Sequence, residues 1–126
     1  MDFSGRSIVL TGVGREGQVG EAVAAAFAGL GARVFLVDRQ ESEARARADA
    51  LVAAGRRAAG LGVDLTDEHA VAALAERVRD ATGGRVHALV HLAGGFVSSG
   101  LVADSDASLW ARQFLLNATT DRKSVV

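Results

Sequence analysis

The chain has 126 residues, of which 49% are hydrophobic and 23% are charged, and its formal net charge is −1. This balance predicts one soluble globular domain and argues against a disordered or nucleic-acid-binding protein. Because cysteine is absent, a disulfide framework and a thiolate metal site are excluded, and a reducing cytoplasm is the expected compartment. No run of about 18 uncharged apolar residues occurs, and the opening apolar run is too short for a signal peptide, so we expect no membrane span.

Short apolar runs alternate with helical patterns along the whole chain. The expected strands cover residues 7–10, 33–37, 58–63 and 87–92. The expected helices cover residues 18–30, residues 41–54, a segment with Thr66 as its N-cap that ends before Gly83, and residues 106–119. This alternation predicts an α/β fold with a parallel sheet, in which helices cover both faces of continuous apolar strands.

Two of the expected helices differ in how they can pack. The helix at 41–54 is charged and rich in alanine, and its expected anchors are Leu51 and Val52. The helix at 106–119 has an expected apolar face formed by Leu109, Trp110, Phe114 and Leu116. Trp110 and Phe114 are spaced by one helical turn, so we interpret them as core or subunit-contact residues.

A glycine-rich segment joins the first expected strand to the first expected helix. It reads TGVGREGQVG over residues 11–20, and Gly12, Gly14 and Gly17 match the pattern G-x-G-x-x-G. At this position a backbone without Cβ atoms can approach a pyrophosphate, and the start of the helix offers free N–H groups and a partial positive charge. The placement therefore predicts dinucleotide binding, although glycines of this kind also occur in ordinary turns.

Acidic side chains follow the second and third expected strands. Asp38 lies 18 residues beyond Gly20, where a carboxylate accepts hydrogen bonds from the adenosine ribose and disfavours a 2′-phosphate, which predicts NAD. Arg39 and Arg15 could each pair with a 2′-phosphate, so NADP stays open. Asp64 has the same strand-end position and could reach the adenine, or it could be an ordinary loop acid.

Four motifs in this order resemble the N-terminal half of the short-chain dehydrogenase/reductase family. They are TGVGREGQVG at 11–20, VDR at 37–39, VDL at 63–65 and HLAGG at 91–95, followed by an asparagine at 117. The family's fourth-strand motif is usually Asn-Asn-Ala-Gly, and here its first two residues are His91 and Leu92. The glycine loop also has two more residues than the family pattern T-G-x-x-x-G-x-G.

The resemblance implies a Rossmann-type, doubly wound sheet with strand order 3-2-1-4 and a NAD(P)-binding half domain over residues 1–120. It places Gly20 at the family's last loop glycine and Val19 at the apolar residue that touches cofactor. It adds Leu65, Ala93 and Gly94 to the cofactor-binding candidates and makes Asn117 the catalytic candidate, through a water-linked proton relay. The family's fourth helix often forms a dimer interface, so a homo-oligomer is expected.

The residues that would complete the chemistry are missing from this chain. In the resembled family a serine, a tyrosine and a lysine follow the asparagine, but this sequence has no tyrosine, and Lys123 is its only lysine. Residues 121–126, DRKSVV, could be a polar C-terminal end. They also resemble a translated sequencing adapter, so a cloning or sequencing artefact is the other alternative. We therefore expect a parent enzyme that reduces a carbonyl or oxidises an alcohol, and no turnover by this chain.

Two other functions stay open. A non-catalytic dinucleotide-binding or regulatory domain fits the absence of tyrosine, and another doubly wound domain could bind a different nucleotide or a methyl donor. No metal site is expected, because His87 and His91 would stand about 13 Å apart along one strand.

Overall fold

The computed structural model of the chain describes residues 1–96, 98 and 100–121. Its strands are β1 (Ser7–Thr11), β2 (Arg33–Asp38), β3 (Arg57–Gly62) and β4 (Ala88–His91). Its helices are α1 (Val19–Gly29), α2 (Glu41–Ala53), α3 (Glu68–Thr82) and α4 (Ala107–Phe114), with a 3-10 turn η1 (Val102–Asp104) and a π-helical turn η2 (Leu115–Thr119). Every expected strand and helix is present with slightly shifted ends. Lys123 and the rest of the tail from residue 122 lie outside the described residues.

The four strands form one parallel sheet with the order β3-β2-β1-β4. The chain moves outward from β1 to β3 and then returns to place β4 on the other side of β1. The sheet therefore has the doubly wound arrangement, in which ligands bind outside the carboxyl ends of the strands where the order reverses. Both the α/β Rossmann-type class and the strand order predicted from the sequence are confirmed.

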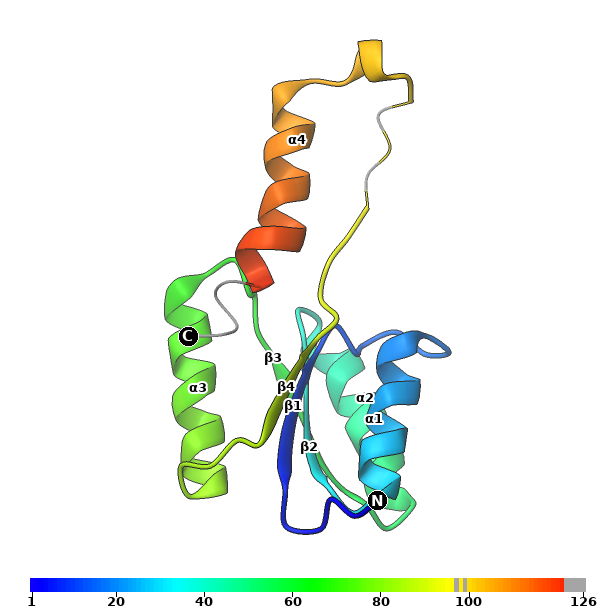
Figure 1. Cartoon of the computed structure of the whole chain (residues 1–126), viewed down its shortest axis with the longest axis vertical. Coiled ribbons are helices and arrows are strands. Elements are labelled where there is room, and N and C mark those ends of the chain that lie inside the picture. Colours follow the sequence, from blue (N-terminus) through cyan, green and yellow to red (C-terminus); the bar gives the residue numbers. More distant parts are fainter. Residues whose placement is uncertain (97, 99, 122–126) are drawn as a thin grey trace.

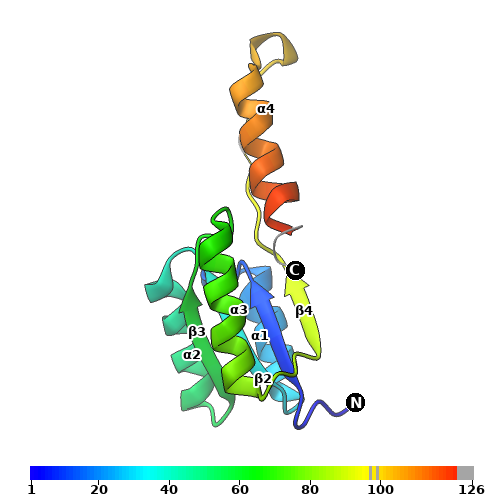
Figure 2. The same cartoon turned by 90° about the vertical axis from the view of Figure 1, so that its left-hand side faces the viewer.

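Helices cover the two faces of the sheet unequally. Figure 1 shows α1 and α2 on one face and α3 on the other, while α4 extends beyond the carboxyl ends of the strands. Turned by 90°, Figure 2 shows α3 in front of the sheet and β4 at its edge. One side of β4 is therefore unpaired among the described residues, as the sequence predicted for the fourth strand.

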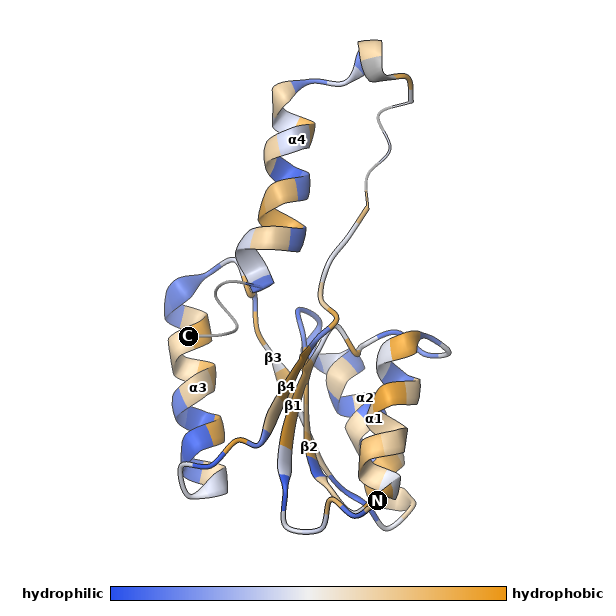
Figure 3. Cartoon of the chain, in the orientation of Figure 1, coloured by the Kyte–Doolittle hydropathy of each residue, from blue (hydrophilic) through white to orange (hydrophobic). Residues whose placement is uncertain are grey.

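Alternating side chains of the strands build a core on each face of the sheet. Ile8, Leu10, Val34 and Leu36 pack with small residues of α1 and α2, whereas Val9, Phe35, Val37 and Leu61 pack with Leu74 and Val78 of α3. Figure 3 shows these strands in hydrophobic colours between helices that also carry hydrophilic segments. Burial on both faces explains why β1 and β2 are continuous apolar runs.

Helix α2 packs through alanines rather than through its large side chains. Ala44 and Ala48 are buried, while Val52 is 53% exposed and Leu51 is only partly buried. The expected anchors were therefore wrong in part. A Cβ atom on Gly60 of β3 would lie 2.5 Å from the backbone of Ala44, so α2 sits directly on the strand and small residues must meet there.

The N-cap of α3 is Asp67, one residue after the predicted Thr66. The Asp67 carboxylate accepts the N–H groups of His69 at 2.9 Å and Ala70 at 3.2 Å. Thr66 instead donates its N–H and its hydroxyl to Asp64. The error arose because both residue types cap helices, and only the backbone shows where the helix begins.

Helix α4 begins at a similar cap but buries none of its residues. The Asp106 carboxylate accepts hydrogen bonds from the Ser108 hydroxyl and the Leu109 N–H. These two hydrogen bonds, the one from Ser108 more than the one from Leu109, hold the pKa of the Asp106 carboxyl below its ordinary value. Trp110 and Phe114 are 72% and 70% exposed, so they are not core residues. Among the residues that the structure describes, no helix has the length and apolar character needed to cross a membrane.

Candidate functional site

The glycine-rich loop begins at the end of β1, in a narrow gap between the ends of β2 and β4. Gly12 follows β1 with a positive φ of 75°, and its N–H donates to the Val37 carbonyl at 2.9 Å. On the other side, a Cβ atom on Gly12 would lie 2.5 Å from the Ala93 nitrogen. Glycine is required here for its backbone conformation and for its size.

The carboxylate of Asp38 is fixed against the same loop. Its Oδ2 atom accepts the Gly14 N–H at 3.0 Å, and its Oδ1 atom accepts the Gln40 N–H at 3.0 Å. A Cβ atom on Gly14 would lie 2.7 Å from the Asp38 Cγ, so the carboxylate rests directly on the loop backbone. The structure thus brings together the loop and the strand-end acid that the sequence singled out separately.

Close packing of α1 onto the loop depends on Gly20 rather than on Gly17. Gly20 is buried, and a Cβ atom there would lie 2.7 Å from the Gly12 carbonyl oxygen. Gly17 has a φ of 72° but open space where its Cβ would be. The glycine that lets α1 pack against the loop is therefore Gly20, three residues after the last glycine of the literal G-x-G-x-x-G match. The family resemblance names the same glycine as the last one of the loop.

Several predicted cofactor residues surround this loop with their side chains in solvent. Arg15 and Arg39 are exposed, and Val19, at the first position of α1, is 67% exposed despite its apolar side chain. An exposed valine at the start of α1, an exposed arginine in the glycine loop and another after β2 leave both apolar and cationic groups accessible to a ligand.

The ends of β3 and β4 complete the same edge of the sheet. Exposed Asp64 follows β3 and accepts the Thr66 N–H at 2.9 Å, while Leu65 is buried. Beyond β4, the Ala93 N–H donates to the Thr11 hydroxyl at 3.3 Å. All four strand ends therefore contribute predicted site residues to one edge.

Asn117 binds the backbone that follows β4. Its Oδ1 atom accepts the Gly95 N–H at 3.0 Å, and its Nδ2 atom donates to the Gly95 carbonyl at 2.8 Å. A Cβ atom on Gly94 would lie 2.6 Å from the same Oδ1. Asn117, the predicted catalytic residue, therefore joins η2 to the loop after β4 through two hydrogen bonds. Gly94 leaves room for the Asn117 side chain.

A polar chain through His91 was not anticipated from the sequence. The His91 Nδ1 atom lies 2.8 Å from the Thr11 hydroxyl, and its Nε2 atom lies 3.5 Å from the Thr120 hydroxyl. These contacts join β1, β4 and the end of the last helical turn. His87 is bound separately, because its Nδ1 atom accepts the Ser7 N–H at 3.0 Å. Within the described part of the chain, no cluster of three metal-ligating side chains occurs.

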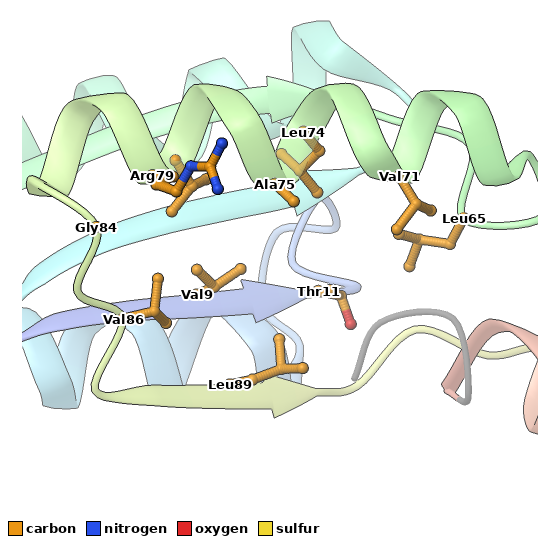
Figure 4. A pocket seen from close by; sticks show the side chains of 11 residues that line it. Val9, Thr11, Leu65, Val71, Leu74, Ala75, Arg79, Gly84, Val86 and Leu89 are labelled. Atoms are coloured by element: carbon orange, nitrogen blue, oxygen red, sulfur yellow. The ribbon is translucent and has the colours of Figure 1, made fainter. Parts of the chain in front are cut away.

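A hollow lies between α3 and the face of β1 and β4. It is a pocket of about 450 Å³, shown in Figure 4. Its lining is Val9, Thr11, Leu65, Val71, Leu74, Ala75, Val78, Arg79, Gly84, Val86 and Leu89. This lining is mainly apolar and includes none of the loop glycines or Asp38, but Thr11 and Leu65 belong both to it and to the edge that carries the predicted site residues.

The fold and this edge of the sheet define a doubly wound α/β protein with a dinucleotide-type glycine loop. The family model for short chain dehydrogenases matches residues 6–120, and the chain belongs to this family. It is 38% identical over 112 residues to an uncharacterised oxidoreductase of Mycobacterium tuberculosis, and 41% identical over 87 residues to the short-chain reductase protein NovJ of Streptomyces niveus. These matches cover 89% and 68% of this chain but only 41% and 32% of those relatives.

Solved structures give the same relationship. A short-chain dehydrogenase/reductase from Burkholderia xenovorans matches with a TM-score of 0.86 and 33% identity, over 97% of this chain and 49% of that one. A metagenomic short-chain oxidoreductase in complex with NADP matches with a TM-score of 0.88 and 32% identity, over 98% of this chain and 54% of that one. The chain therefore spans about half the length of these structures.

Proposed function

We propose that this chain is the cofactor-binding half of an NAD(P)-dependent oxidoreductase. The observation that carries this proposal is the Asp38 carboxylate held on the Gly14 N–H, at the turn from β1 to α1. The positive φ of Gly12 and the tight packing of Gly14 and Gly20 create a backbone cradle without side chains. Such a cradle at a helix start suits a pyrophosphate, because N–H groups and the helix dipole attract negative charge.

Each predicted residue has a part in this proposal. The phosphates would lie against Gly12, Gly14, Arg15, Gly17 and Val19, the adenosine ribose against Asp38 and Arg39, and the adenine against Asp64 and Leu65. Ala93 and Gly94 would face the nicotinamide half, with Asn117 holding the loop beside it. A bound nicotinamide cofactor supplies hydride transfer, while the protein supplies orientation and electrostatics.

The choice between NAD and NADP depends on Asp38. Replacing Asp38 with serine removes charge-assisted hydrogen bonds worth roughly 1.5–3 kcal/mol, so NAD should bind at least tenfold more weakly. The same change removes repulsion of a 2′-phosphate, so NADP should bind more tightly. Calorimetric titration with both cofactors measures the ratio of their dissociation constants, which a general loosening of the loop would leave unchanged. Arg39→Gln is the matched control and should weaken NADP alone. An unchanged ratio in the Asp38→Ser variant would contradict the assignment.

Turnover is not expected from these 126 residues, because the sequence contains no tyrosine to act as the proton donor. Incubating the chain with NADH and a panel of aldehydes and ketones should give no oxidation above background, followed by absorbance. A rate that saturates with a carbonyl compound would overturn this expectation. We propose that the substrate of the longer oxidoreductase is a small carbonyl compound or alcohol.

A non-catalytic dinucleotide-binding or regulatory domain is the second candidate, favoured by the same absence of tyrosine. Both candidates require the loop to bind a nicotinamide dinucleotide, and they differ only in turnover by a longer form. The exposed Trp110 and Phe114 of α4 support a homo-oligomer in either case.

A further inference from the structure

Arg47 of α2 is a largely buried cation outside the proposed cofactor site. Its side chain is 16% exposed, whereas that of Arg45 on the same helix is 63% exposed. In the described part of the chain, the Arg47 Nε atom is buried without a hydrogen-bond partner. Burying a guanidinium is costly unless nearby anions compensate for the lost hydration. The partners of Arg47 therefore determine what this residue does.

Both of its partners belong to the glycine loop or the helix turn that follows it. The Arg47 Nη1 atom lies 3.6 Å from the Glu16 Oε2 atom and 3.8 Å from the Glu21 Oε2 atom. The Glu21 carboxylate in turn accepts the N–H of Gly17 at 2.5 Å. Two connections thus run from α2 to the loop, one directly to Glu16 and one through Glu21 to Gly17.

The two halves of the loop are held differently. Gly12 and Gly14 are fixed by hydrogen bonds to β2 and by contact with Ala93. The half from residue 15 to residue 19 is exposed, and Gly17 has open space around its Cβ position. Apolar packing therefore does not fix this half, and ionic and hydrogen-bond contacts with Arg47 and Glu21 must orient it.

The positive charge of Arg47 also matters for binding an anionic ligand, because its two partners are carboxylates. Glu16 and Glu21 place two carboxylates next to the start of α1, where the proposed function requires a pyrophosphate to bind. Without a neighbouring cation, these carboxylates would repel the ligand. Arg47 is the arginine that contacts both of them.

We propose that Arg47 is a positioning residue for cofactor binding, which holds Glu16 and Glu21 so that the backbone of residues 15–19 keeps the conformation that borders the phosphates. The inference rests on the proposed function and adds a residue that touches no part of the dinucleotide. Arg47 acts on the loop from α2, and the loop acts on the ligand.

The test compares Arg47→Gln with Arg45→Gln, a matched change at an exposed arginine of the same helix. NADH fluorescence measures the dissociation constant, and mass spectrometry of limited tryptic digests measures cleavage after Arg15, inside the loop. Arg47→Gln should weaken NADH binding by about fivefold, the upper range for an ion pair whose carboxylates are exposed to solvent. It should also speed cleavage after Arg15 several-fold. Arg47→Lys should restore part of the NADH affinity and part of the resistance to cleavage, and Arg45→Gln should behave as the unmodified chain does.

A purely structural role would give a different result. Arg47→Gln would then lower the denaturation midpoint but leave the cleavage rate after Arg15 and the NADH affinity unchanged, which would overturn the proposal. If Arg47→Gln does not fold, Glu21→Gln tests the same contacts from the loop side without changing the residues on either side of the cleaved bond. Faster cleavage after Arg15 supports the proposal, and unchanged cleavage contradicts it. If the parent chain binds no nicotinamide cofactor, the proposed function fails, and the cleavage measurement still decides whether Arg47 orders the loop.

Discussion

Replacing Gly12 with alanine is expected to destabilise the chain by about 3 kcal/mol and to abolish dinucleotide binding. The left-handed backbone of this residue costs a non-glycine residue roughly 1–2 kcal/mol. The new Cβ atom would also lie 2.5 Å from the Ala93 nitrogen and 2.6 Å from the Leu92 carbonyl carbon, which are backbone atoms and cannot rotate away. The loop and the end of β4 must therefore separate, and the cradle for the phosphates is lost.

Urea denaturation followed by circular dichroism measures the first effect, and NADH titration of the variant under folding conditions measures the second. Gly17→Ala is the matched control, because Gly17 has nearly the same φ but open space around its Cβ position. Its loss of stability should stay near the strain cost alone, about 1 kcal/mol. Equal stability losses at the two glycines would contradict the close contact of Gly12 with the backbone of Leu92 and Ala93.

Replacing Gly60 with alanine should cost about 3 kcal/mol through a different contact. Its Cβ atom would lie 2.5 Å from the carbonyl carbon and oxygen of Ala44 and from the Arg45 nitrogen. The whole of α2 must then move away from β3, which opens the core on that face. Because the clash involves backbone atoms, a change of side-chain rotamer cannot relieve it.

The same denaturation experiment measures this effect, with Gly29→Ala as the control. Gly29 is in α1, has open space at its Cβ position and has no positive φ, so alanine there should be neutral or slightly stabilising, by at most about 1 kcal/mol. A Gly60→Ala variant as stable as the parent would contradict the direct contact between α2 and β3.

Much of the fold could be predicted from the sequence because each element has a local signal. The apolar runs of β1 and β2 are continuous, and Asp38 marks the end of β2. Close packing of a helix on a strand at glycine and alanine positions leaves no such signal in the sequence. The contact of Ala44 with Gly60 was therefore missed, and larger residues of α2 were expected to anchor the helix.

The candidate site divides in the same way. The glycine loop and Asp38 could be proposed because a chemical requirement fixes their residue types and their spacing. The contact between Thr11 and His91 could not, because these residues are 80 positions apart and meet only after β4 pairs with β1. Asn117 was singled out for a proton relay, and its two hydrogen bonds with Gly95 became visible only from the structure.

Direct binding of a nicotinamide dinucleotide tests the central claim most simply. The 126-residue chain should be titrated with NADH, NADPH and S-adenosylmethionine, with folding checked by circular dichroism. The account predicts saturable binding of one NADH or NADPH per chain, competition by ADP-ribose, no binding of S-adenosylmethionine, and loss of dinucleotide binding in Gly12→Ala but not in Gly29→Ala. A folded chain that binds S-adenosylmethionine and neither dinucleotide would contradict it.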